Sequence, residues 1–450
     1  MNNIIVKDIY RLLNAEIIGN ENALFNFVSI DTREIKENSL YIGLKGERVD
    51  GNDLYSEAFT EGASVCLLEK TPGKDIPKGK AVLLVESTRN AILTLAEYYR
   101  STLKTRVIAI TGSTGKTSTK DILASILETK YKVFKTMGNF NNEIGLPLMI
   151  FKLDDTYDFA VLEMGMSQRG EIDVLARTAK PEIAIITNIG LSHIEHLKTK
   201  ENIFKAKMEI TNYFNENNLL VVNGDDQYLN SLKEKDFKVL SGGFEKGDYI
   251  LENVKTLKEE TIFTTNSFNN EIKINMPGRH NALNTLLSII VASKLGIDIE
   301  SLDEIKVSKS DMRMDIIGLK NIYVINDCYN ANPQSMKAAI DYLSTYRERK
   351  VAILGTMKEL GEDSANYHRE VARYAKDKGI DILVAIGEYS KEMEDGFIKE
   401  SGCFYGFRTF EEASSKLSDM LKKDDVILVK ASRGMYFERF MPLLEEFGGK

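Results

Sequence analysis

A short run of small and basic residues at positions 111–117, Thr-Gly-Ser-Thr-Gly-Lys-Thr, has the make-up of a phosphate-binding loop. Gly112 and Gly115 allow the backbone to approach phosphate oxygens closely, and Lys116 supplies positive charge for the terminal phosphates. The hydroxyl of Thr117 can ligate Mg²⁺. ATP is favoured over GTP because the chain contains no Asn-Lys-x-Asp guanine signature. The residues expected to contact ATP here are Gly112, Ser113, Thr114, Gly115, Lys116, Thr117 and Ser118.

This loop is shorter than the common phosphate-loop pattern G-x-x-x-x-G-K-[ST]. Ile110 stands where that pattern has its first glycine, and the nearest earlier glycine, Gly112, is only three residues before Gly115. A plain glycine turn before a surface helix is the alternative interpretation. It is disfavoured because an apolar strand, the Gly-Lys-Thr triplet and a helical pattern follow one another directly.

Three side chains further along the chain could complete a phosphoryl-transfer site. Glu163 ends an apolar run and is placed to bind the same magnesium ion as the loop threonine. His193 also follows an apolar run, in a chain with only 4 histidines, although a loop histidine with ordinary hydrogen bonds is an equally good interpretation. Lys207, on these grounds alone, is predicted to be a helix-surface lysine.

Apolar runs alternate with helical patterns along the chain, which predicts an α/β fold. A helix at about 116–128 should follow the phosphate loop, residues 245–275 should form a hairpin or meander, and a helix is expected at 280–295. A mainly parallel sheet covered by helices is the natural architecture for this central ATPase part. Its expected strands are 107–110, 159–162, 183–186 and 219–222.

Similar patterns before and after the central part predict two more domains. The expected N-terminal strands are 39–44, 63–68 and 81–85, with a helix at 88–99. The expected C-terminal strands are 324–325, 351–354, 382–386 and 426–429, which indicate a doubly wound, Rossmann-like sheet. The predicted domains are therefore residues 1–104, 105–312 and 313–450.

The composition is that of a soluble globular protein, with 43 % hydrophobic and 28 % charged residues. A net charge of −8 argues against binding of nucleic acid over a broad surface. The three cysteines, Cys66, Cys328 and Cys403, are scattered and indicate neither a disulfide framework nor a cysteine metal site. The N-terminus does not resemble a signal peptide, and no window approaches a membrane span. We expect a monomeric, cytoplasmic protein.

Five segments occur in the order and approximate spacing of the Mur ligase family, which the chain resembles. They are the loop 111–117, the Glu163-Met-Gly segment, 189–196, the pair Ala206-Lys207 and 278–281. The shortened loop is also similar to that of the folylpolyglutamate synthases. The resemblance implies that this loop belongs to an ATP-dependent amide ligase rather than to a motor or a GTPase switch.

Further segments resemble the branch of the family that adds D-alanyl-D-alanine to UDP-MurNAc-tripeptide in peptidoglycan precursor synthesis. They lie at 29–33, 43–51, 138–147, 326–336, 354–363 and 429–434, and so extend over nearly the whole chain. Two positions depart from the family pattern, because Thr356 stands where Asp is usual and Ala431 where Gly is common. The Asp-Asn-Pro-Arg motif of the diaminopimelate-adding relative is absent.

The resemblance implies a reaction in two steps. The carboxylate of the UDP-linked peptide attacks the γ-phosphate of ATP to give an acyl phosphate, and the incoming amine then attacks the carbonyl carbon to form an amide. Two magnesium ions are implied, one at Thr117 and Glu163 and a second near Glu163, His193 and a carbamoylated Lys207. Carbamoylation would turn this lysine from a cation into an anion. The implied catalytic residues are Lys116, Glu163, His193 and Lys207.

The resemblance also implies nucleotide contacts outside the loop. Asn281 is similar to the family's adenine-binding position, although a residue at a helix start can instead be an N-terminal cap. Arg313 would contact a phosphate when the C-terminal domain closes, with a salt bridge as the alternative. Asp327 and Asn330, with Asn332 nearby, follow an expected strand at the edge where open α/β sheets bind ligands, and turn capping is their alternative.

Binding of the UDP-linked substrate is implied for loops of the N-terminal domain and for an asparagine-rich loop of the central domain. Polar loop residues of this kind are often only solvated. The expected residues are Ser29, Asp31, Thr32, Arg33, Lys45, Gly46, Glu47, Arg48, Asp50, Asn139, Asn141 and Asn142.

Two other functions remain open at this point. One is a different amide ligase, such as the lysine- or diaminopimelate-adding Mur enzyme or a folylpolyglutamate synthase, which would use another amine acceptor. The other is a nucleotide-dependent switch that retains the loop without transfer chemistry. Under the ligase interpretation, three sets of ligand-like residues fall on three domains, and closure of these domains would exclude water from the acyl phosphate.

Overall fold

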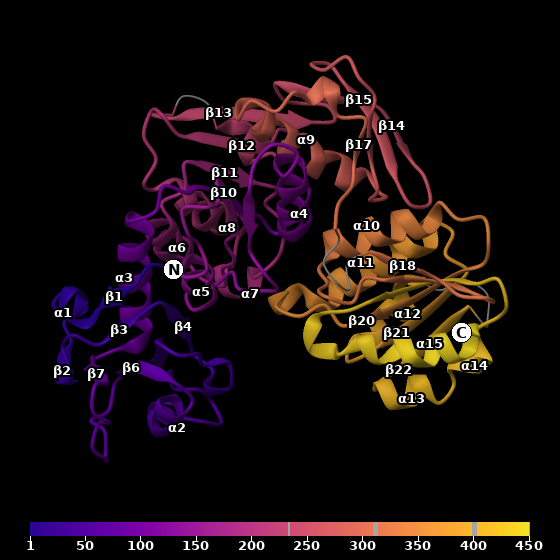
Figure 1. The fold of residues 1–450 in the computed structure, drawn as a ribbon. Helices are drawn as coiled ribbons and strands as arrows, with labels where there is room; N and C mark the ends of the chain where they lie inside the picture. Colours follow the sequence, from indigo (N-terminus) through magenta and orange to yellow (C-terminus); the bar gives the residue numbers. More distant parts are fainter. Residues whose placement is uncertain (233–234, 309–313, 398–402, 450) are drawn as a thin grey trace.

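The computed structural model describes residues 1–232, 235–308, 314–397 and 403–449. Three mostly parallel sheets follow one another along the chain, each with its own helices (Figure 1). The predicted α/β class with three domains is thereby confirmed. In the described part of the chain, no helix is long and apolar enough to cross a membrane. Arg313, an expected phosphate contact, lies outside the described residues.

The largest sheet has ten strands. They are β8 (Arg106–Thr111), β9 (Val133–Lys135), β10 (Phe159–Glu163), β11 (Ile183–Ile186), β12 (Leu219–Asn223), β13 (Lys238–Gly243), β14 (Tyr249–Thr256), β15 (Thr261–Thr265), β16 (Ile272–Ile274) and β17 (Glu304–Ile305). Their spatial order is β17-β16-β15-β14-β13-β12-β11-β8-β10-β9. The strands from β9 to β14 in this order run parallel, and β14, β15 and β16 form an antiparallel meander, as expected for residues 245–275.

Strand β8 shows why the central strands are continuous apolar runs. Val107 and Ala109 pack into one hydrophobic cluster, and Ile108 and Ile110 pack into another on the opposite face. A strand that is buried on both faces has no solvent-facing position for a polar side chain, so its buried residues are apolar. Helices α4 (Lys116–Leu127) and α9 (Arg279–Lys294) cover one face, and the other face is covered by α5 (Gly145–Ile150), α6 (Glu171–Ala179) and α8 (Lys200–Met208).

The N-terminal part forms a five-stranded sheet in the order β2-β7-β6-β5-β4, in which only the β2 and β7 pair is antiparallel. The predicted strands and helix are all found. The elements are β1 (Ile4–Ile5), α1 (Val6–Ile9), β2 (Glu16–Gly19), β3 (Leu24–Phe25), β4 (Phe27–Ser29), β5 (Ser39–Ile42), α2 (Tyr55–Thr60), β6 (Ala63–Leu68), β7 (Ala81–Leu84) and α3 (Thr88–Ser101).

The C-terminal part forms a six-stranded sheet with helices on both faces, as predicted. Its strands are β18 (Asp315–Gly318), β19 (Tyr323–Asn326), β20 (Lys350–Gly355), β21 (Ile382–Ile386), β22 (Phe404–Phe407) and β23 (Val426–Lys430), and their order is β18-β19-β23-β20-β21-β22. The helices are α10 (Pro333–Ser344), α11 (Ser364–Asp377), α12 (Ser390–Phe397), α13 (Phe410–Ser414), α14 (Leu417–Met420) and α15 (Phe440–Gly448). Only the edge strand β18 runs antiparallel to its neighbour.

Helix α3 joins the N-terminal part firmly to the central part. It packs against α5 and α6, and one hydrophobic cluster runs through both parts. The Tyr99 hydroxyl donates a hydrogen bond to the buried carbonyl of Leu153 (2.7 Å), and Nε of Arg100 donates to the carbonyl of Ala179 (3.0 Å). The two parts therefore share one hydrophobic core.

Replacing Tyr99 by Phe should lower the free energy of unfolding by about 1–2 kcal/mol, because the Leu153 carbonyl loses its hydrogen-bond donor inside the core. Urea unfolding followed by circular dichroism measures this. The matched control is Tyr98→Phe on the same helix, since Tyr98 is 36 % exposed and should change stability by less than about 0.5 kcal/mol. Equal effects of the two substitutions would contradict the structural role of this hydrogen bond.

Candidate active site

A cavity of about 450 Å³ lies where the central sheet faces the C-terminal part of the chain. Its walls come from the carboxyl ends of β8, β10 and β11, from the start of α9, and from the loop between β19 and α10. Carboxyl ends of parallel strands are the edges where open α/β sheets bind ligands. The cavity is therefore the candidate site.

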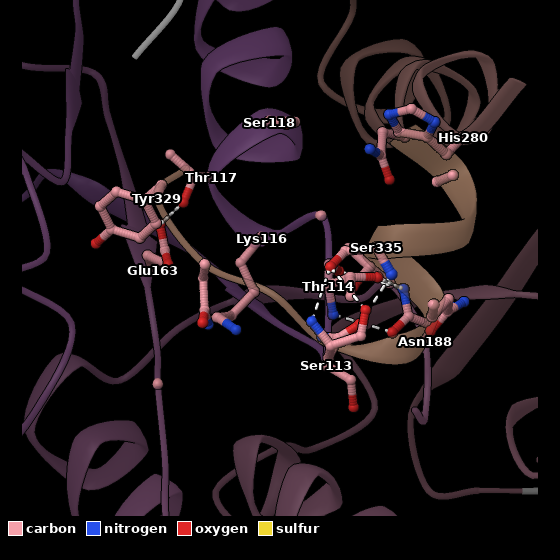
Figure 2. Close-up of a pocket in the computed structure, with 18 of the residues that line it drawn as sticks. Ser113, Thr114, Lys116, Thr117, Ser118, Glu163, Asn188, His280, Tyr329 and Ser335 are labelled. Carbon is pink, nitrogen blue, oxygen red and sulfur yellow. Dashed lines mark hydrogen bonds between the residues drawn. The ribbon is translucent and has the colours of Figure 1, made fainter. Parts of the chain in front are cut away.

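The expected phosphate loop connects β8 to α4, and its residues 113–118 line the cavity (Figure 2). Gly112 has a φ of +149°, and a β-carbon at this position would lie 1.8 Å from Oγ1 of Thr187. Gly115, with a φ of +81°, caps the start of α4. The first N–H groups of a helix lack intrahelical acceptors and attract phosphate. Nζ of Lys116 donates to the Gly112 carbonyl (2.8 Å).

Asn188, in the loop after β11, supports the shortened phosphate loop from the side (Figure 2). Its Oδ1 accepts a hydrogen bond from the backbone N–H of Thr114 (3.1 Å), and its Nδ2 donates to Oγ1 of the same residue (2.8 Å). Its carbonyl accepts from the N–H of Ser113 (3.1 Å). Sequence reasoning gave Asn188 no role, and its place just after an apolar strand was the only signal that could have found it.

Glu163 and Thr117 meet at the floor of the cavity. Oγ1 of Thr117 donates to Oε2 of Glu163 (2.9 Å), and Nδ2 of Asn141 donates to Oε1 (3.0 Å). Glu163 is only 3 % exposed. The two residues predicted to share a cation therefore present neighbouring oxygen atoms, and Asn141, predicted to contact the other substrate, touches the same carboxylate.

Lys207 is buried in α8, with 2 % exposure, so its interpretation as a helix-surface lysine is wrong. Burial, together with the nearby charge of Lys116, lowers the pKa of Lys207 well below its ordinary value. A buried ammonium loses its hydration without full compensation, which favours the neutral amine. Lys207 lies behind the described lining of the cavity rather than in it.

His193 lines the cavity and lies in the left-handed region of backbone conformation, with a φ of +63°. Its Nδ1 is 2.5 Å from Oε2 of Glu359, a residue of the C-terminal part. The interaction with His193 lowers the pKa of Glu359 below its ordinary value. Sequence reasoning assigned no role to Glu359, although it lies in the segment 354–363 that resembles the Mur ligases.

The C-terminal wall of the cavity contains Asp327 and Asn330, as expected for nucleotide contacts. Lys430 joins them, because its Nζ forms an ion pair with Oδ2 of Asp327 (2.5 Å) and donates to the Asn330 carbonyl (2.9 Å). Its side chain is only 3 % exposed. Sequence reasoning missed Lys430, whose signal was its position at the end of an apolar strand.

The two remaining asparagines of the nucleotide prediction also line the cavity. Asn281 is buried in α9 and donates from Nδ2 to the Pro277 carbonyl (2.8 Å). Its alternative interpretation as an N-terminal cap is wrong, because Gly278 occupies that position. Asn332 does cap α10, and its Nδ2 also donates to Oγ of Ser192 across the domain junction (2.9 Å).

The structure divides the residues predicted for the UDP-linked substrate into two groups. Asn139, Asn141 and Asn142 line the cavity, whereas the N-terminal residues lie outside its described lining. Ser29 ends β4, Thr32 and Arg33 lie in a short 3-10 helix, and the others are Asp31, Lys45, Gly46, Glu47, Arg48 and Asp50. Asp31 pairs with Arg33 and Asp50 pairs with Lys70, and each partner lowers the pKa of the carboxyl to about 2.

Three family models match successive parts of the chain. "Mur ligase family, catalytic domain" matches residues 24–100, "Mur ligase middle domain" matches 110–292, and "Mur ligase, glutamate ligase domain" matches 312–433. The chain belongs to the Mur ligase family. The chain is therefore an ATP-dependent ligase.

The similarity of this Mur ligase to known proteins extends over nearly its full length. UDP-N-acetylmuramoyl-tripeptide--D-alanyl-D-alanine ligase of Bacillus subtilis is 37 % identical over 95 % of this chain and 94 % of its own. The crystal structure of MurF from Acinetobacter baumannii has a TM-score of 0.89, with 27 % identity and 99 % coverage of both chains. MurF of Thermotoga maritima in complex with ADP has a TM-score of 0.82, with 31 % identity over 94 % of this chain and 97 % of its own.

The two departures of this Mur ligase from the family pattern lie side by side. Thr356 and Ala431 are both buried, and the backbone N–H of the next residue, Ser432, donates to the Thr356 carbonyl (3.3 Å). Neither of the two lines the described cavity. Their side chains are therefore buried outside the described lining of the cavity.

Replacing Gly112 by Ala should weaken ADP binding about tenfold or more in this Mur ligase. The new methyl group would overlap Thr187, and the positive φ would cost a side chain about 1–3 kcal/mol. Isothermal titration calorimetry with Mg²⁺ and ADP measures the dissociation constant. Gly73→Ala is the control, because its β-carbon would have nothing within 4 Å. Unchanged affinity in Gly112→Ala would disprove the steric requirement.

Proposed function

We propose that this Mur ligase joins D-alanyl-D-alanine to UDP-N-acetylmuramoyl-tripeptide in the cytoplasmic synthesis of the peptidoglycan precursor. The similarity to relatives whose names state this reaction, over 95 % of the chain at 37 % identity, carries the proposal. The cavity at the junction of the central and C-terminal parts supports it with a phosphate loop and a buried carboxylate.

The first chemical problem for such a ligase is the meeting of two negative groups, the substrate carboxylate and the γ-phosphate. Lys116 and the N-terminal end of α4 place positive charge and N–H donors where the phosphates would lie. Attack by the carboxylate oxygen forms the acyl phosphate and releases ADP. The amine of the dipeptide then attacks the carbonyl carbon, phosphate leaves, and the amine loses a proton.

Magnesium fits the first of two proposed sites. Oγ1 of Thr117 and Oε2 of Glu163 are neighbouring oxygen donors, 2.9 Å apart, and Mg²⁺ prefers oxygen ligands. A cation held by these residues and the ATP phosphates would neutralise charge during phosphoryl transfer. The role of Thr117 and Glu163 is to hold that cation in position.

A second magnesium ion is proposed near Glu163, His193 and Lys207. Among the described residues, no cluster of three His, Cys, Asp or Glu side chains could hold a metal by itself, so another anionic ligand is needed. A carbamate on Lys207 would supply it, since a neutral buried amine can attack CO₂ and release one proton. His193 would contribute a nitrogen, which magnesium accepts less readily than oxygen.

We propose that each domain binds a different ligand, with domain boundaries near 104/105 and 312/313. The N-terminal loops that contain residues 29–33 and 45–50 hold the UDP group, and the central domain binds ATP. Asn139, Asn141 and Asn142 reach the tripeptide end, and the C-terminal domain brings the dipeptide. We propose a monomer that binds neither nucleic acid nor membrane, in keeping with the net charge of −8.

The deciding experiment is phosphate release by the purified protein with ATP, Mg²⁺, D-alanyl-D-alanine and UDP-MurNAc-tripeptide, ending in lysine or in diaminopimelate, with each component omitted in turn. We expect release only from the complete mixture, together with a pentapeptide product detected by mass spectrometry. Release with another amine acceptor would indicate a different amide ligase. ATP binding without release in any mixture would favour a nucleotide-dependent switch.

Replacing Lys116 by Ala should lower the turnover number at least about 100-fold, because a charge that stabilises the transferring phosphate is removed. The same phosphate-release assay measures this. Lys130→Ala, on the surface after α4, should retain nearly full turnover. Near-normal turnover in Lys116→Ala would contradict the proposed phosphate site.

Replacing Lys207 by Ala should abolish a carbamate signal in the ¹³C NMR spectrum of protein equilibrated with ¹³C-bicarbonate, and should lower turnover by a similar factor of about 100. Lys205→Ala is the matched control, because Lys205 lies on the same helix but is half exposed and paired with Glu201. The control should keep both the signal and the activity. A carbamate signal that persists without Lys207 would exclude this residue as its site.

A further inference from the structure

Residues 356–363 form the loop between β20 and α11. None of them has a role in the proposed reaction described above. The loop reaches across the domain junction to the loop after β11. Its Glu359 has a φ of +63°, as does His193 on the other side. Non-glycine residues rarely adopt this conformation, and such residues cluster at functional sites. Two of them therefore meet at one contact, where Nδ1 of His193 lies 2.5 Å from Oε2 of Glu359.

The Glu359 loop is held rigidly by its own domain. The N–H of Met357 donates to Nε2 of the buried His368 (2.8 Å), and the N–H of Lys358 donates to Oγ of Ser432 (2.9 Å). Across the junction, the carbonyl of Glu359 accepts from the N–H of Glu195 (3.3 Å). Hydrogen bonds thus fix the backbone at residues 357, 358 and 359, and this fixed backbone positions the Glu359 carboxylate.

The contact has a chemical consequence for the histidine. At 2.5 Å two facing lone pairs would repel each other, so the ring proton of a neutral His193 belongs on Nδ1, although this close contact does not have the geometry of a regular hydrogen bond. Nε2 then keeps its lone pair and can act as a ligand. Histidines that bind metals commonly donate their other ring N–H to a carboxylate, which fixes the tautomer and the ring orientation.

We propose that Glu359 is a positioning residue, supplied by the C-terminal domain, that fixes His193 of the central domain in the Nδ1–H tautomer. His193 would then become competent only when the C-terminal domain docks. The functional part of this inference rests on the proposed role of His193 as a magnesium ligand. The tautomer assignment does not depend on that role, and it can be measured without an activity assay.

The first test is the ¹⁵N NMR spectrum of histidine-labelled full-length protein at about pH 8.5, where unperturbed imidazole is neutral. The chain has only 4 histidines, so four ring systems must be assigned. His368 is an internal reference, because its Nε2 accepts from Met357 and its Nδ1 lies 2.7 Å from the Ser364 carbonyl. We expect both His193 and His368 in the Nδ1–H form in the wild type.

Glu359→Gly removes the carboxylate and suits the positive φ, so the loop should keep its shape. In this variant the His193 signals should move toward the Nε2–H form while those of His368 stay in place. Glu359→Gln should preserve the wild-type tautomer, because its amide oxygen still accepts a hydrogen bond. Glu362→Ala, an exposed carboxylate on the same loop, is the matched control and should change neither ring.

The second test is steady-state kinetics of phosphate release with all substrates. We expect kcat to fall about 10- to 100-fold in Glu359→Gly, to recover largely in Glu359→Gln, and to stay within about twofold in Glu362→Ala. The KM for ATP should change little, since the phosphate loop is untouched. Thermal unfolding of each variant shows that the fold is retained.

Different failures are distinguishable. An unchanged His193 tautomer in Glu359→Gly overturns the inference, whatever happens to kcat. A changed tautomer with normal kcat overturns the positioning role. Full turnover in His193→Ala would instead remove the proposed ligand role of that histidine, and failure of the complete assay in the wild type would remove the proposed function itself.

Discussion

Close packing between β8 and β11 is the constraint on which the site depends. Gly112 approaches Thr187 so closely that no side chain fits between them, which places the phosphate loop directly beside the loop after β11. Parallel pairing of β8 with β10 sets Glu163 opposite Ile110, and this register brings the carboxylate within reach of Thr117. The residues proposed to bind phosphate and the cation are therefore brought together by strand register.

The loop after β11 also connects the phosphate loop to the C-terminal domain. Oγ of Ser192 donates to the carbonyl of Ser113 (3.0 Å) and accepts from Nδ2 of Asn332 (2.9 Å). One hydroxyl thus contacts both the proposed phosphate loop and the residue that caps α10. The position of the C-terminal domain and the shape of the phosphate loop are consequently linked through a short chain of hydrogen bonds, beside the contact between His193 and Glu359.

Burial makes Lys207 the most unusual titratable group near the site. An ammonium ion at this depth is costly, and the neighbouring positive charge of Lys116 adds to the cost. The neutral amine is favoured, and a neutral amine is also the reactive form. The same physical cause that lowers the pKa of Lys207 therefore prepares it for the modification proposed above.

The α/β class, the strands and the candidate phosphate loop can be predicted from the amino-acid sequence alone, because continuous apolar runs and the Gly-Lys-Thr triplet are local patterns. The sequence also placed Glu163 at the end of a strand and His193 in the segment that follows another strand. The fold was needed to show that Lys207 is buried, that Asn188 forms hydrogen bonds to the loop, and that Lys430 and Glu359 lie at the site. Burial and contacts between distant segments are set by packing, and a helical pattern alone does not reveal which face of α8 a neighbouring element covers.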